Sequence, residues 1–170
     1  MKLFYAIICA CILLVACAPP VDNSAQEAFE KNSQTVIDNL KGFQNENVDY
    51  SQYAEDFVMR GTGFGDKDSI SLAEMKEMDK NNWKVLDFKM VTYPVVLLPG
   101  VAVDTKKADG SVRFYSTWEV TLPATDSTEA RSGHINLYES FDFDEDGKIV
   151  FQQVYGDFGG IIQHLFNPQE

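Results

Sequence analysis

The stretch that decides the fold is HINLYESFDFDEDGKIVFQQVYGDFGGIIQHLF, which runs from His134 to Phe166. On both sides of its acidic centre, aromatic and β-branched residues alternate with polar ones, a pattern typical of strands. From Phe158 onward the pattern changes to a short apolar segment that predicts a helix ending before Pro168. The chain therefore closes with two paired strands and one helix.

The centre of this stretch, DFDEDG (142–147), has two interpretations. Aspartates at alternate positions followed by a glycine are how a twelve-residue calcium loop between two helices begins. The flanks here are strands, however, and position 12 of such a loop falls on Gln153, where a bidentate glutamate is needed. We therefore expect a metal-free turn at residues 144–147, with Gly147 in the left-handed region.

Further strands are predicted between residue 84 and this stretch. Residues 84–93 alternate apolar and polar side chains, and VVLLPGVAV (95–103) is an apolar run that we expect to be buried, with a bulge or bend at Pro99-Gly100. The dipeptide Asp109-Gly110 is a strong hairpin signal ahead of SVRFYSTWEVTL (111–122). The second half of the chain thus reads as an antiparallel sheet.

Helical periodicity marks the first half of the chain. SAQE (24–27) and SLAE (71–74) both have the spacing of a capping box, in which a serine is followed three residues later by a glutamate. The first predicted helix ends near Gly42. The helix that begins at residue 71 has Met75 and Trp83 on its apolar side.

Between these two helices we expect a shorter one over Ser51–Phe57, with Tyr53 and Phe57 on the same face. The loop after it, RGTGFGDKD (60–68), spaces its glycines as G-x-G-x-G. No Lys-Ser/Thr pair follows them and no strand–loop–helix unit frames them, so a flexible loop is favoured over a phosphate site.

The N-terminus resembles a bacterial lipoprotein signal. One lysine precedes an apolar run up to residue 16, which is too short for the roughly 20 residues of a membrane-spanning helix. The run ends in Leu-Val-Ala-Cys, so we expect removal of residues 1–16, acylation of Cys17, a tether at 17–23 and one domain at 24–170. The alternative is an ordinary secretory signal with a chance cysteine. The lipid would hold the domain on a membrane of the cell envelope, outside the cytoplasm.

Charge and composition exclude several classes of function. The net charge is −12 and the longest basic run is Lys106-Lys107, which disfavours nucleic-acid binding. Cys9 and Cys11 lie in the segment expected to be removed, so no disulfide is predicted. Two histidines and no thiolate pair argue against structural zinc, and no cofactor is predicted.

Candidate chemistry lies on the predicted strands. Residues two apart share a face, so His134 and Tyr138 project together, either to solvent or into a concave pocket. Asp157 ends a strand ahead of a helix, where it is either the helix N-cap or a cavity carboxylate suited to proton transfer. His134 is either structural or a base. Tyr155 shares a face with Asp157, and Trp118 lies on an earlier strand.

The order helix, short helix, glycine loop, helix and antiparallel strands resembles the nuclear-transport-factor-2-like superfamily, in which SnoaL-type polyketide cyclases and ketosteroid isomerases are found. The residues that carry the resemblance are YSQYAEDFVMRGTGFG (50–65) and the stretch quoted first. It implies an α+β fold in which three N-terminal helices pack on a curved antiparallel sheet, closing a cone-shaped barrel with a short C-terminal helix. It also implies a cavity for a small apolar molecule and, by analogy, a homodimer.

Two functions follow from these observations. The first is a lipid-anchored envelope protein that binds a small apolar ligand without chemistry, with Tyr53, Phe57, Trp118, Tyr138 and Tyr155 as ligand-binding candidates. The second is an isomerase- or cyclase-like enzyme in which Asp157 shuttles a proton and His134 or a tyrosine orients a carbonyl. We favour the first because no complete catalytic set is visible in the sequence.

Overall fold

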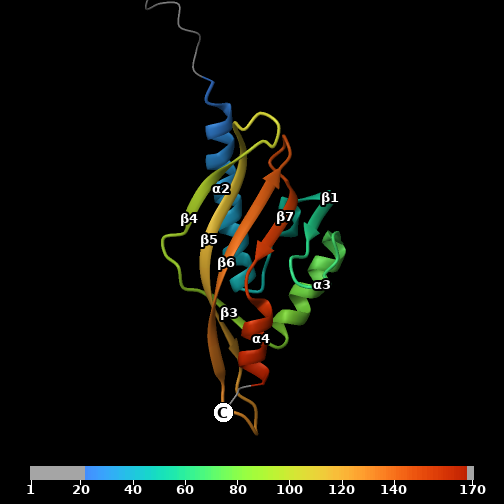
Figure 1. Cartoon of the computed structure of the whole chain (residues 1–170), viewed down its shortest axis with the longest axis vertical. Coiled ribbons are helices and arrows are strands. Elements are labelled where there is room, and N and C mark those ends of the chain that lie inside the picture. Colours follow the sequence, from blue (N-terminus) through green and yellow to red (C-terminus); the bar gives the residue numbers. More distant parts are fainter. Residues whose placement is uncertain (1–21, 168–170) are drawn as a thin grey trace, which may run out of the picture.

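A computed structural model describes residues 22–167 as three helices and one mixed sheet (Figure 1). The segments expected to be signal peptide and most of the tether, with Cys17, lie outside the described residues. No helix within residues 22–167 has the length and apolar character needed to cross a membrane. The helices are α2 (Ser24–Gln44), α3 (Leu72–Trp83) and α4 (Phe158–Phe166), with a 3-10 turn η1 (Tyr50–Gln52). The strands are β1 (Tyr53–Arg60), β2 (Ile70–Ser71), β3 (Asp87–Met90), β4 (Val96–Val101), β5 (Ala108–Leu122), β6 (Arg131–Phe143) and β7 (Ile149–Tyr155).

The sheet is ordered β2-β1-β7-β6-β5-β3, and β4 also pairs with β5. All pairs are antiparallel except β1 with β7, which is parallel. The long strands β5 and β6 pair continuously from Val112–Phe141 to Leu122–Arg131, so their alternate residues fall on one face. The architecture is thus an α+β fold on an open, mostly antiparallel sheet.

One hydrophobic core joins all three helices to a single face of this sheet, which we call the inner face. Val36 of α2, Met75 of α3 and Leu165 of α4 belong to the same buried cluster as Phe114 and Phe141 of the sheet. The opposite, outer face is open: the side chains of Val96 and Tyr115 there are 53% and 57% exposed. The helices therefore cover only one side of the sheet.

The C-terminal half matches the sequence prediction closely. The two predicted strands on either side of the acidic turn and the helix from Phe158 are confirmed. The predicted turn at 144–147 is also confirmed: Gly147 has φ of +80°, and Asp144 accepts hydrogen bonds from the backbone N–H groups of Asp146 and Lys148 at 3.0 and 2.8 Å. The bend at Pro99-Gly100 is present as a register shift between β4 and β5.

The predicted second helix over Ser51–Phe57 is wrong. Only the 3-10 turn η1 forms, and Tyr53 begins strand β1. Tyr53 and Phe57 are four residues apart, a spacing that puts two side chains on one face of either a helix or a strand. Parallel pairing with β7 decides for the strand, and both side chains are buried on the inner face. Residues 22–167 therefore contain two helices ahead of strand β3, not the three predicted.

Two predicted boundaries of the first helix are also wrong. The N-cap of α2 is Asn23, which makes no side-chain cap hydrogen bond, so Ser24 does not form a capping box. The helix continues through Gly42 to Gln44. Gly42 has another use, since a Cβ there would lie 3.0 Å from the backbone of Asn47 and Val48.

The hairpin between β4 and β5 turns earlier than Asp109-Gly110. Its turn spans Ala102 to Lys107, with φ of +57° at Lys106, and residues 109 and 110 lie within β5. Gly110 has φ of +82° and crosses α2 so closely that a Cβ would lie 2.8 Å from the Cβ of Ala28. The positive φ of this glycine serves helix packing instead of a reverse turn. The preceding strand, predicted as a buried run, is an edge strand with Val96 and Leu98 partly exposed.

The capping box at α3 is confirmed and yields a stability prediction. Ser71 Oγ accepts from the N–H of Glu74 at 3.3 Å, and the Glu74 carboxylate accepts from the N–H of Ser71 at 2.9 Å. Ser71→Ala should lower the free energy of unfolding by about 1 kcal/mol in urea titrations. The matched control is Ser24→Ala, where the same sequence pattern forms no cap and the change should be close to zero. Equal losses in the two variants would contradict this assignment.

Candidate functional site

A buried carboxyl group interrupts the apolar inner face of the sheet. Glu139 of β6 lies opposite Phe114 of β5 and Val154 of β7, and the next inward residue of its own strand is Phe141. The residue is only 5% exposed. A carboxylate in such surroundings loses its hydration and favours the protonated form.

This carboxyl is at one end of a hydrogen-bonded chain that reaches three other elements. The Gln152 side chain of β7 hydrogen-bonds Glu139. Tyr53 of β1 donates its hydroxyl proton to Gln152 Oε1 at 3.5 Å and accepts from Asn39 Nδ2 of α2 at 2.8 Å. We call Glu139, Gln152, Tyr53 and Asn39 the inner polar cluster. It joins α2 to β1, β7 and β6 within the core.

The protonation state of Glu139 follows from its position. Burial raises the pKa of its carboxyl to about 8, and the hydrogen bond from Gln152 opposes the shift only in part. Glu139 therefore carries a proton at neutral pH. A protonated carboxyl can donate a hydrogen bond to a carbonyl or ether oxygen, or transfer a proton to it.

A second acid lies near the cluster, on α3. Asp79 Oδ2 accepts from the Tyr50 hydroxyl at 2.9 Å, and burial raises the pKa of the Asp79 carboxyl to about 6. The Lys76 ammonium lies 4.9 Å from the centre of the Tyr50 ring. Burial, followed by the charges of Asp79 and Glu139, raises the pKa of Tyr53. Asp79 and Glu139 thus both influence the ionisation of Tyr53.

Three residues predicted from the sequence as ligand-binding candidates lie on the inner face. Tyr53 and Phe57 pack edge to face with ring centres 4.8 Å apart. Trp118 is buried, and its indole N–H donates to Ser116 Oγ at 3.0 Å. Tyr53 belongs to the inner polar cluster and Phe57 packs against it, whereas Trp118 lies further along β5 and packs against Phe43 of α2.

The other predicted residues lie elsewhere. Asp157 is exposed and caps α4, accepting from the N–H of Gly160 at 2.9 Å. His134 is on the outer face, where its side chain is 61% exposed and lies 3.6 Å from the Glu119 carboxylate. Asp157 is therefore a helix N-cap and not a cavity carboxylate. His134 lies in a row that faces solvent and not in a concave pocket.

Tyr138 and Tyr155 also lie on the outer face. They form a row with Tyr115, with ring centres 5.0 and 6.4 Å apart across β5, β6 and β7. The row faces away from the helices, so these tyrosines cannot contact a ligand held at the inner polar cluster.

Glu139, Gln152 and Asn39 were missed in the sequence analysis. The signal for Glu139 was present, because an acid replaces an apolar residue in the alternating series that includes Ile135, Leu137 and Phe141. An unpaired acid in the buried register of a strand marks a group with a perturbed pKa. Gln152 and Asn39 have no such local signal, since only the tertiary fold brings them near Glu139.

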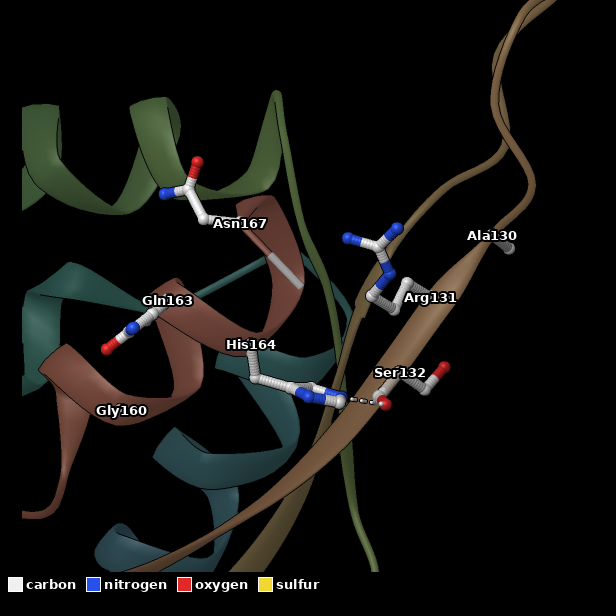
Figure 2. Close-up of a pocket in the computed structure, with 7 residues that line it drawn as sticks. All are labelled: Ala130, Arg131, Ser132, Gly160, Gln163, His164 and Asn167. Atoms are coloured by element: carbon white, nitrogen blue, oxygen red, sulfur yellow. Dashed lines mark hydrogen bonds between the residues drawn. The ribbon is translucent and has the colours of Figure 1, made fainter. Parts of the chain in front are cut away.

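A shallow depression of about 590 Å³ lies between α4 and the start of β6 (Figure 2). The Arg131 guanidinium donates to the carbonyl of Leu165 at 2.6 Å, and a hydrogen bond of 3.1 Å joins His164 Nε2 to the carbonyl of Ser132. Both bonds fasten α4 to β6. Within the described residues, no cluster of three or more His, Cys, Asp or Glu side chains is arranged to hold a metal ion.

No protein-family model and no curated protein sequence matches this chain. Solved structures of the same fold do match. A protein assigned as a SnoaL-like polyketide cyclase from Shewanella denitrificans has 12% identity and a TM-score of 0.58, covering 81% of this chain and 98% of its own. An LEH-like epoxide hydrolase from M. tuberculosis has 14% identity and a TM-score of 0.55, covering 82% and 92%. A protein assigned as an isomerase from Bacillus subtilis has 13% identity and a TM-score of 0.59, covering 84% and 96%. These similarities show a nuclear-transport-factor-2-like fold.

The two raised pKa values predict how stability depends on pH. The native protein holds the Glu139 proton up to about pH 8, whereas the unfolded chain releases it near 4.5. The contribution of Glu139 to stability is therefore largest below pH 4.5 and falls as the pH rises toward 8, by about 1.4 kcal/mol for each pH unit. Asp79 acts in the same direction but only up to about pH 6.

Urea unfolding between pH 6 and 8 isolates the contribution of Glu139. Glu139→Gln should abolish the slope in this window and leave the protein at pH 8 at least as stable as the wild type. Glu55→Gln, at an exposed position of β1, is the matched control and should keep the wild-type slope. A wild-type stability that is constant from pH 6 to 8 would refute the burial of a protonated Glu139.

Proposed function

We propose that this chain is a lipid-anchored envelope protein that binds a small, mostly apolar molecule between the inner face of its sheet and the helices. The observation that carries the proposal is the inner polar cluster. A few convergent polar groups in apolar surroundings are the usual composition of a small-ligand site. Because Glu139 carries a proton at neutral pH, the ligand has a neutral oxygen that accepts a hydrogen bond.

A second candidate function is acid–base catalysis at the same place. The raised pKa of Glu139 favours it, because a general acid works best with a pKa near the working pH. Glu139 then takes the role expected of Asp157, whose carboxylate is used as a helix cap. The fold neighbours assigned as cyclase, epoxide hydrolase and isomerase support this class of chemistry without identifying a reaction.

The membrane anchor rests on the sequence. A basic start, an apolar run and Leu-Val-Ala-Cys in that order are what the processing and acylation of a lipoprotein require. Two or more acyl chains give stable membrane attachment, whereas a single chain is reversible. The anchor would hold the domain at the membrane surface through the short tether that leads to α2.

Ligand binding can be tested with Nile red, a neutral apolar dye that carries a carbonyl oxygen. Glu139→Met, which cannot donate a hydrogen bond, should weaken its binding about tenfold, the effect of losing one buried hydrogen bond. Tyr53→Phe, which removes the hydrogen bond to Gln152, should weaken it as well. Asp157→Asn keeps the helix cap and should bind the dye as the wild type does. Weakening by Asp157→Asn alone would move the site back to the helix cap. Turnover of a neutral epoxide that Glu139→Gln abolishes would decide for the enzyme.

The anchor predicts a change in cell fractionation. Cys17→Ser removes the acylated thiol, so the protein should move from the membrane fraction to the soluble fraction and keep residues 1–16. Mass spectrometry of the wild-type N-terminus should show an acylated Cys17. Cys11→Ser, inside the segment expected to be removed, is the control and should leave both results unchanged. A Cys17→Ser variant processed and partitioned like the wild type would exclude the lipid anchor.

A further inference from the structure

The turn between β4 and β5 presents an apolar tip to solvent. It is closed by backbone hydrogen bonds of 2.9 Å from Ala102 to the Lys107 carbonyl and from Lys106 to the Ala102 carbonyl. The Lys106 ammonium also bonds the carbonyl of Val103. Val103 is 86% exposed, and half of the Val101 surface is exposed as well. The tip is therefore closed by its own hydrogen bonds and leaves Val103 almost fully exposed.

This tip also holds the two adjacent lysines that form the longest basic run of the chain. Lys106 and Lys107 follow the exposed valine in a molecule whose net charge is −12. Asp104 lies in the same turn, and the acidic turn at 144–147 is at the same end of the molecule, set back along the sheet (Figure 1). Lysine stems can lie along an apolar surface while their ammonium groups reach polar headgroups.

The position of the β4–β5 turn next to the tether indicates which partner the turn contacts. Figure 1 shows the turn beside the first turn of α2, at the end of the molecule where the described chain begins. The pKa of Asp22 is lowered chiefly by hydrogen bonds with Ser24 and in part by the charge of Lys107, so this ammonium lies near the start of the domain. Five peptide steps separate Asp22 from Cys17, a reach of at most about 18 Å.

We infer that the β4–β5 turn docks on the headgroup region of the membrane that holds the lipid anchor, with Val103 inserted and Lys106 and Lys107 at the headgroups. The inference rests on the proposed acylation of Cys17. A short tether keeps the turn close to the lipid surface at all times, so even a weak contact is strongly favoured once the chain is anchored. The contact fixes the orientation of the domain.

In this orientation the two ends of the molecule have different surroundings. The loop at 123–130, which joins β5 to β6, lies at the end opposite the turn (Figure 1). Docking of the turn would point this loop away from the membrane. The domain stands on its β4–β5 turn instead of moving freely on its tether.

Site-specific quenching tests the inference. The full lipidated protein is inserted into phosphatidylcholine vesicles with brominated acyl chains, which quench a nearby fluorophore. A thiol-reactive fluorophore is attached in Val103→Cys, or in Asp126→Cys within the loop at 123–130 as the matched control. With Cys17 acylated, each introduced cysteine is the only free thiol. Circular dichroism confirms that both variants are folded.

We expect the label at residue 103 to be quenched at least fivefold more strongly than the label at residue 126. Lys106→Glu combined with Lys107→Glu should reduce quenching at residue 103 at least twofold when the vesicles also contain phosphatidylglycerol, with co-sedimentation unchanged. Equal quenching at both positions, or quenching at neither while the protein co-sediments, would overturn the docking and leave the anchor intact. Cross-linking between two copies through residue 103 would assign the tip to a second copy of the chain and also overturn it. Loss of co-sedimentation in the parent protein would refute the anchor itself, and the docking with it.

Discussion

The continuous pairing of β5 with β6 determines which side chains face the helices. From Val112–Phe141 to Leu122–Arg131, each pair commits two residues to the same face, and a shift by one position would exchange the two faces. The register buries Phe114 and Phe141 under α2 and sends Tyr115 and Tyr138 to the open side. It also places Glu139 in the core, so the candidate site is a consequence of this pairing.

Burial of the Glu139 carboxyl lowers the stability of the fold, so its presence in the core needs an explanation. An apolar residue at this position would continue the row of its neighbours and remove the cost of a buried carboxyl. The structure instead surrounds it with hydrogen-bonding groups from three other elements, Gln152, Tyr53 and Asn39. Natural proteins retain such groups where function needs them, and a group with a perturbed pKa in the core is a candidate of that kind.

The two proposals concern different parts of one molecule. The inner polar cluster lies between the sheet and α2, whereas the β4–β5 turn lies beside the first turn of the same helix. Docking of the turn would therefore hold α2, and with it Asn39, at a fixed position above the membrane. The tyrosine row on the outer face belongs to neither proposal, and the homodimer expected by analogy stays a prediction.

Local signals in the sequence determined the elements whose structure depends on neighbours along the chain. The capping box of α3, the turn at 144–147 and the helix from Phe158 were all readable, because their hydrogen bonds join residues two to four apart. The tertiary structure decided what depends on distant partners. Pairing with β7 made a strand of a segment with helical spacing, Gly110 was used for packing on α2, and burial selected Glu139 over Asp157. Such contacts join residues that are far apart in the chain, so the local sequence around each residue does not predict them.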